Sequence, residues 1–178
     1  MTKGIINFLL LFPVITAIYV IAGEGNSMKS EFSRYEVIYR YTYSVHQLPI
    51  GEYTEVTIKN KGRIKIEWQR REPKEYPVNN NQESKVTKNS KKEKLSRDEE
   101  TAFRNLLKKI DLDELKSKYE DTTLIPMQAN YSTFSSLEIK LDDKEKKIEI
   151  IDESAMPEEL KEIYDYLVKF RDTIKKEK

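Results

Sequence analysis

The sequence predicts an α+β fold in which an antiparallel sheet of about five strands, a three-strand meander plus a hairpin, carries two amphipathic helices on one face. Three observations predict it. Apolar and aromatic residues alternate with polar ones over 35–45, 53–59 and 63–68, which is the period of a half-buried strand. Two later segments have apolar residues at helical spacing. Each strand has one apolar face and each helix has one apolar stripe, and both are buried when the helices pack on one face of the sheet.

An N-terminal hydrophobic segment precedes this domain, and residues 1–22 are predicted to be a signal peptide or a membrane anchor. Lys3 is followed by an uncharged, mainly apolar stretch over 4–23, with Ala22 suited to cleavage. The stretch is also long enough to span a bilayer, although Pro13 favours cleavage. Both interpretations place the domain outside the cytoplasm, and contact with a membrane is expected only through residues 4–23 if they are retained.

Residues 31–72 are predicted to form the meander. The alternation over 35–45 gives the first strand, and the segments 53–59 and 63–68 give the next two. Asn60 and Gly62 lie between these two segments and accept the left-handed backbone of a tight turn. Residues 73–95 follow as a polar stretch rich in lysine and asparagine, which buries too little apolar surface to offset its ordering entropy. We therefore expect a linker or loop there.

Residues 96–178 are predicted to be the α-β-β-α portion of the same domain. Ser96 and Glu99 have the spacing of a capping box, and apolar residues at helical spacing follow as far as Asp111. A hairpin is expected over 134–150. The last helix is expected to begin near Pro157, because proline suits the first helical turn, and its buried stripe consists of Leu160, Ile163, Tyr164, Leu167, Phe170, Arg171 and Ile174.

The composition excludes several kinds of chemistry. The 178 residues include no cysteine and one histidine, so disulfides, thiol nucleophiles, Cys-ligated zinc and two-His zinc motifs are absent. Three of the five glycines lie in the first 25 residues, which leaves too few for a phosphate-binding loop. We expect no catalytic residue, no cofactor and no metal ligand. Without residues 1–22 the chain has 31 basic and 31 acidic residues, and this zero net charge argues against nucleic acid as the partner.

A possible interaction surface is predicted from the tyrosines of the first strand and the lysines of the polar stretch: Tyr35, Tyr39, Tyr41, Tyr43, Lys85, Lys88, Lys91 and Lys92. Tyrosine rings suit flat partners and protein interfaces. Burial of one strand face explains the same alternation, so the stripe is either core or binding surface. The triplet Asn130-Tyr131-Ser132 is a formal glycosylation sequon, and its modification depends on the host.

Two sets of residues suit a hydrolase. His46 lies near Ser44 and Glu52, which allows it a role as a general base, although no nucleophile motif accompanies it. The acidic groups 98–100, 111–114, 142–143 and 158–159 offer carboxylate pairs. Most of them fall at expected helix starts or turns, where acids also have a structural role.

The segments Glu55–Trp68, Leu95–Glu99, Tyr131–Ile150 and Met156–Leu160 resemble small secreted or cell-envelope domains. In order of elements they are also similar to the emfourin-type inhibitors of thermolysin-like metalloproteases. No functional residue is carried over, because the glycine-rich start of those inhibitors is missing here and 73–95 is extra. We therefore expect a non-catalytic extracytoplasmic domain that binds a protein or an envelope polymer, in one version a protease inhibitor. The alternatives are an envelope hydrolase using His46 or a carboxylate pair, and an anionic-polymer binder acting through 73–95.

Overall fold

A computed structural model describes residues 31–46, 48–74, 83–120 and 131–176 of the chain. The predicted signal peptide or anchor at 1–22 and the sequon residue Asn130 lie outside these residues.

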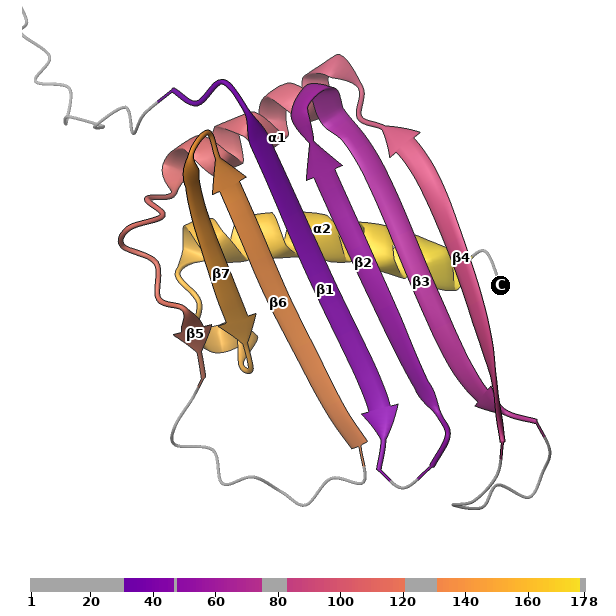
Figure 1. Ribbon diagram of the computed structural model, residues 1–178. Helices are drawn as coiled ribbons and strands as arrows, with labels where there is room; N and C mark the ends of the chain where they lie inside the picture. Colours follow the sequence, from indigo (N-terminus) through magenta and orange to yellow (C-terminus); the bar gives the residue numbers. More distant parts are fainter. Residues whose placement is uncertain (1–30, 47, 75–82, 121–130, 177–178) are drawn as a thin grey trace, which may run out of the picture.

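The described chain forms a seven-stranded sheet in the order β4-β3-β2-β1-β6-β7-β5 (Figure 1). Neighbouring strands are antiparallel, except that β5 runs parallel to β7. The strands are β1 (Tyr35–Val45), β2 (Gly51–Lys59), β3 (Arg63–Pro73), β4 (Ser84–Lys94), β5 (Lys118–Tyr119), β6 (Tyr131–Leu141) and β7 (Lys144–Ile150).

The prediction of an antiparallel sheet of about five strands is therefore wrong, because the sheet has seven strands and is mixed. The two additional strands are β4 and β5. Residues 84–94 of the stretch 73–95, predicted as a linker or loop, form strand β4, which pairs with β3 along its whole length, whereas residues 75–82 of that stretch lie outside the described residues. The prediction failed because it tested only for buried apolar side chains, whereas a neighbouring strand can order a polar segment through backbone hydrogen bonds.

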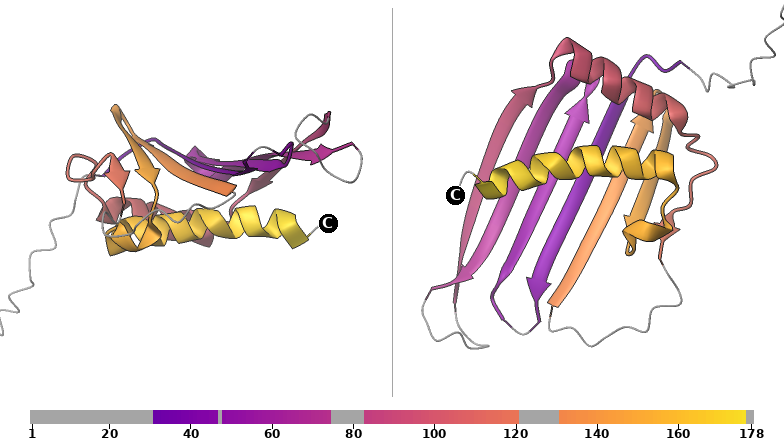
Figure 2. Two further views of the ribbon diagram at one scale, coloured as in Figure 1. Left: turned by 90° about the horizontal axis from the view of Figure 1, so that it is seen from below. Right: turned by 180° about the vertical axis from the view of Figure 1, so that it is seen from behind.

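Both helices cover the same face of the sheet (Figure 2). Helix α1 (Arg97–Lys109) begins at a capping box, in which the Ser96 hydroxyl accepts from the Glu99 amide and the Glu99 carboxylate accepts from the Ser96 amide. Helix α2 (Glu158–Lys176) crosses the strands from β7 toward β3. The strands extend beyond α2 at the end where β1 finishes, so neither helix covers that part of the sheet.

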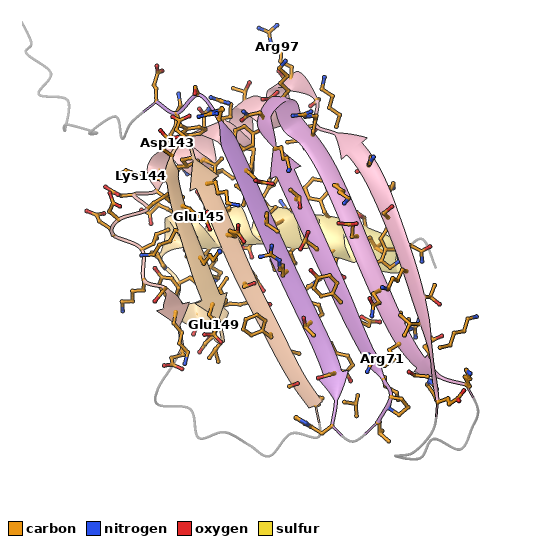
Figure 3. The ribbon with its side chains drawn as sticks, viewed as in Figure 1. Arg71, Arg97, Asp143, Lys144, Glu145 and Glu149 are labelled. Atoms are coloured by element: carbon orange, nitrogen blue, oxygen red, sulfur yellow. The ribbon has the colours of Figure 1, made fainter. Side chains whose placement is uncertain are left out.

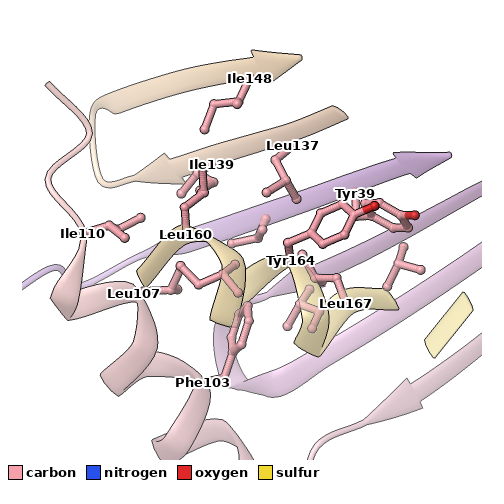
Figure 4. Packing of buried hydrophobic residues seen from close by; sticks show 14 of the residues in the cluster. Tyr39, Phe103, Leu107, Ile110, Leu137, Ile139, Ile148, Leu160, Tyr164 and Leu167 are labelled. Carbon is pink, nitrogen blue, oxygen red and sulfur yellow. The ribbon is translucent and has the colours of Figure 1, made fainter. Parts of the chain in front are cut away.

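The hydrophobic core lies between this face and the two helices (Figure 4). Tyr39 of β1 and Tyr164 of α2 meet edge to face at 5.4 Å between ring centroids, and both are fully buried. Their hydroxyls are satisfied, since Arg171 Nη1 donates to Tyr39 at 3.0 Å and Tyr164 donates to Glu153 at 2.7 Å. Other buried residues of this cluster are Phe103, Leu107, Ile110, Leu137, Ile139, Ile148, Leu160 and Leu167.

A single 3₁₀ turn, Asn60–Gly62, joins β2 to β3 beneath the start of α1. Gly62 has φ +64° and is buried, and a Cβ placed on it would lie 2.9 Å from Leu95 Cβ. The Gly62 carbonyl also accepts from the Leu95 amide at 2.9 Å. Glycine is therefore required at this position both by the backbone conformation and by the close approach of Leu95.

We expect Gly62→Ala to lower the free energy of unfolding by at least about 1–2 kcal/mol, because it forces a side chain into the left-handed region and against Leu95. Urea unfolding followed by circular dichroism measures this change. Lys61 is the matched control, since it has φ +65° in the same turn and Lys61→Gly removes such strain. A stability loss in Lys61→Gly equal to that in Gly62→Ala would contradict the specific requirement for glycine at position 62.

Candidate functional site

The face of the sheet opposite the helices carries polar and charged side chains. On the central strands these charges are paired. Arg40 of β1 donates from Nε to Glu55 at 2.8 Å and from Nη1 to Glu138 at 3.0 Å, so it lies between carboxylates of β2 and β6. Lys140 Nζ lies 2.7 Å from the other oxygen of Glu138. Lys59 and Glu36 form a further pair at 2.7 Å, so the centre of this face is charge-balanced.

The surroundings of Glu138 and Tyr53 on this face shift their pKa values. Burial alone would raise the pKa of Glu138, but the hydrogen bonds and charges of Lys140 and Arg40 outweigh it and hold the pKa below its ordinary value. Burial, together with the hydrogen bond to Glu55 at 2.8 Å, raises the pKa of Tyr53 to about 12. Glu138 therefore stays ionised and Tyr53 stays neutral at pH 7, so neither of the two exchanges protons near neutral pH.

Strands β3 and β4 carry a different charge pattern on the same face. In β3 the residues Ile64 and Ile66 point to the helices and are buried, so the residues between them point away. The register places Lys94 opposite Arg63, Lys92 opposite Lys65 and Lys88 opposite Gln69. Opposed residues of paired strands share a face. We define the basic face as the six exposed cations Arg63, Lys65, Arg71, Lys88, Lys92 and Lys94.

The basic face contains two consecutive cross-strand pairs of like charge, Arg63 with Lys94 and Lys65 with Lys92. Glu67 is the one carboxylate that β3 and β4 place on this face, and it pairs with Lys65 at 2.8 Å. Within the described residues, the other five cations of the basic face have no carboxylate within ion-pair distance. The basic face is therefore a concentration of exposed, uncompensated positive charge.

Toward β7 the same face carries both signs of charge, and Lys147 lies 3.1 Å from Glu145 there. Figure 3 shows Arg71 on β3 and, across the sheet, Glu145 and Glu149 on β7. Arg63 also lines a hollow of about 340 Å³, together with other cations and the carboxylates Glu36, Asp142 and Asp143. Since acids compensate the cations in the hollow, it offers a weaker attraction for an anion than the basic face does.

The four tyrosines of β1 differ in burial along the strand. Tyr35 and Tyr39 are buried core residues, so they are unavailable to a partner. Tyr41 is half-buried, and the guanidinium of Arg171 lies 4.7 Å from its ring centroid. Tyr43 lies farther along, where the helices no longer cover the sheet, and its ring is 6.0 Å from that of the exposed Tyr131.

The four lysines of the predicted surface also divide. Lys88 and Lys92 belong to the basic face, whereas Lys85 and Lys91 point to the helix side of β4. The surface predicted from the sequence omits Arg63, Lys65, Arg71 and Lys94. The signal that could have revealed them is the every-second-residue spacing of 63 with 65 and of 92 with 94, which places like charges on one face once both segments are treated as strands.

The groups considered for hydrolysis are dispersed. His46 is exposed in the turn after β1, and within the described residues no hydrogen bond or ion pair joins it to Ser44 or Glu52. Ser44 instead contacts Ser132, with 2.8 Å between their hydroxyls. Among the acidic groups, Glu99 caps α1 and Asp142 accepts from the Ser33 and Arg34 amides. In the described chain no three His, Asp or Glu side chains are grouped to hold a metal.

Neither α1 nor α2 combines the length and hydropathy of a membrane-crossing segment, within the part of the chain that the structure describes. Comparisons with protein-family models, with curated proteins and with solved structures each found no match.

We expect Glu138→Gln to lower the free energy of unfolding at pH 7 by about 1–3 kcal/mol, because hydrogen bonds to a charged group become bonds to a neutral one. The folded pKa of Glu138 is below the unfolded value, so its stabilisation is complete above the unfolded pKa of about 4.3 and is lost as the pH falls through the folded pKa. The difference from the wild type should therefore shrink at acid pH.

Urea unfolding of both proteins at pH 7 and below pH 4 measures this dependence. Glu145→Gln is the control, since Glu145 is exposed on the same face and its loss should change stability by less than about 0.5 kcal/mol. A difference between wild type and Glu138→Gln that stays constant with pH would refute the charge-dependent role of Glu138.

Proposed function

We propose that this protein is a non-catalytic binding domain, acting outside the cytoplasm, whose basic face binds an anionic macromolecule. The observation that carries the proposal is the pair of like-charge contacts across β3 and β4, Arg63 with Lys94 and Lys65 with Lys92.

Like charges directly opposite each other weaken a strand pair. These contacts therefore do not contribute to the stability of the sheet. The centre of the same face has the opposite arrangement, in which Arg40 and Lys140 meet Glu55 and Glu138. An anionic partner would relieve the repulsion at β3 and β4, so recognition accounts for opposed charges that do not stabilise the sheet.

The location and partner class follow from the sequence. Residues 1–22 have the pattern of a signal peptide or an anchor, which directs the domain out of the cytoplasm. The zero net charge of the chain after residue 22 favours a local contact with a protein or an envelope polymer over nucleic acid. An envelope hydrolase has less support, since His46 is exposed and Ser44 is engaged with Ser132.

We expect the triple substitution Lys88→Glu, Lys92→Glu and Lys94→Glu to weaken binding of poly-L-glutamate at least about tenfold, because several exposed ion pairs of about 0.2–1 kcal/mol each are lost and repulsion is added. Fluorescence anisotropy of labelled polymer at about 50 mM NaCl measures the affinity. Raising the salt to about 300 mM should weaken wild-type binding, since screening acts on exposed charges.

The matched control is Lys116→Glu, Lys147→Glu and Lys169→Glu, which changes the net charge equally at exposed positions off the basic face. It should change the affinity by less than about threefold. Equal losses in the two triple variants would mean that overall charge, and not the basic face, attracts the polymer. No measurable binding by the wild type would also contradict the proposal.

A further inference from the structure

Strand β4 forms one edge of the sheet and pairs only with β3 among the described strands. Its eleven residues pair in one continuous register, from Lys94 opposite Arg63 to Ser84 opposite Pro73, with no bulge. An antiparallel strand of this regularity directs alternate N–H and C=O groups away from its neighbour. The outer edge of β4 therefore presents a long row of backbone donors and acceptors.

Burial does not explain why β4 is ordered. None of its eleven side chains is buried, and its one aliphatic residue, Val86, is 41% exposed. Fixing each residue of a backbone costs about 1–2 kcal/mol of conformational entropy, and burial of apolar side chains normally offsets much of this. In β4 the pairing with β3 has to offset it, so the strand adds an edge to the sheet without adding to the core.

The edge is protected by charge alone. Proteins usually blunt an edge strand by shortening it, by a bulge, by proline or by lysines. The opposite edge uses the first method, since β5 has two residues. Strand β4 uses only lysines, with Lys88, Lys92 and Lys94 on the basic face and Lys85 and Lys91 on the other face. Such charge repels the β4 edge of a second copy but attracts an acidic strand.

We propose that β4 accepts an acidic, extended segment of a partner protein as an eighth strand of the sheet. This inference rests on the proposed function and names its partner class and binding mode. The partner's backbone would complete the outer edge of β4, and its carboxylates would face the lysines on the basic face. A polypeptide fits better than a phosphate or sugar polymer, because it supplies N–H and C=O groups at the strand repeat.

The experiment uses the full chain, kept in solution with a non-ionic detergent, and four probes. The first is an eleven-residue peptide with Glu at every second position and Val or Thr between them. The second has the same Glu residues, with two of the intervening residues replaced by Pro. The third has Gln in place of Glu, and the fourth is polyphosphate. Fluorescence anisotropy measures affinity, and amide hydrogen exchange measures protection of residues 84–94.

We expect the first peptide to bind at least about tenfold more tightly than the proline and glutamine peptides, because only it combines charge with strand pairing. It should also slow exchange of β4 amides that are fast in the free protein. The variant Lys88→Glu, Lys92→Glu and Lys94→Glu should no longer bind this peptide. It should instead bind the equivalent peptide with Lys in place of Glu.

Binding of the proline peptide or of polyphosphate as tightly as the first peptide, with no added protection in β4, would overturn strand addition and leave the proposed function standing. Tight binding of the glutamine peptide would overturn the requirement for acidic residues. Failure of all three anionic probes to bind would overturn both the inference and the proposed function.

Discussion

The backbone pairing between β3 and β4 is the contact on which the basic face depends. Strand β3 is held in place by Ile64 and Ile66, which are buried beneath the helices. Strand β4 has no buried side chain, so its position is set by its hydrogen bonds to β3. Because side chains alternate with a period of two, a slip of one residue would move Lys88, Lys92 and Lys94 to the helix side. The register between β3 and β4 therefore determines which lysines lie on the basic face.

The sheet uses charge in two ways on one face. At the centre, Glu55 and Glu138 neutralise Arg40 and Lys140. These ion pairs link the side chains of β1, β2 and β6 across the face. At the β4 edge the cations are opposed to one another and exposed to solvent. The first arrangement stabilises the fold, whereas the second costs stability and attracts anions. Within a single sheet, the charges that stabilise the fold are thus distinct from the charges that we propose bind a partner.

Periodicity predicted the elements that bury side chains, and it failed where burial was absent. The alternation from Tyr35 corresponds to β1, and the Ser96–Glu99 capping box begins α1. Strand β4 could not be predicted in this way, because none of its side chains is buried, and β5 is too short to have a period. Without β4 the register opposing Lys65 to Lys92 could not be inferred, so four of the six residues of the basic face were missed. Periodicity also cannot separate core from surface tyrosines, because the positions of the two helices decide which tyrosines are buried.

The register of β4 on β3 is tested most directly by interstrand nuclear Overhauser effects between backbone protons in the isotope-labelled protein. The account predicts contacts that join residue 65 to residue 92 and residue 69 to residue 88. Contacts displaced by one residue, or no contacts between the two segments, would contradict it, because the lysines of β4 would then not share a face with Arg63 and Lys65.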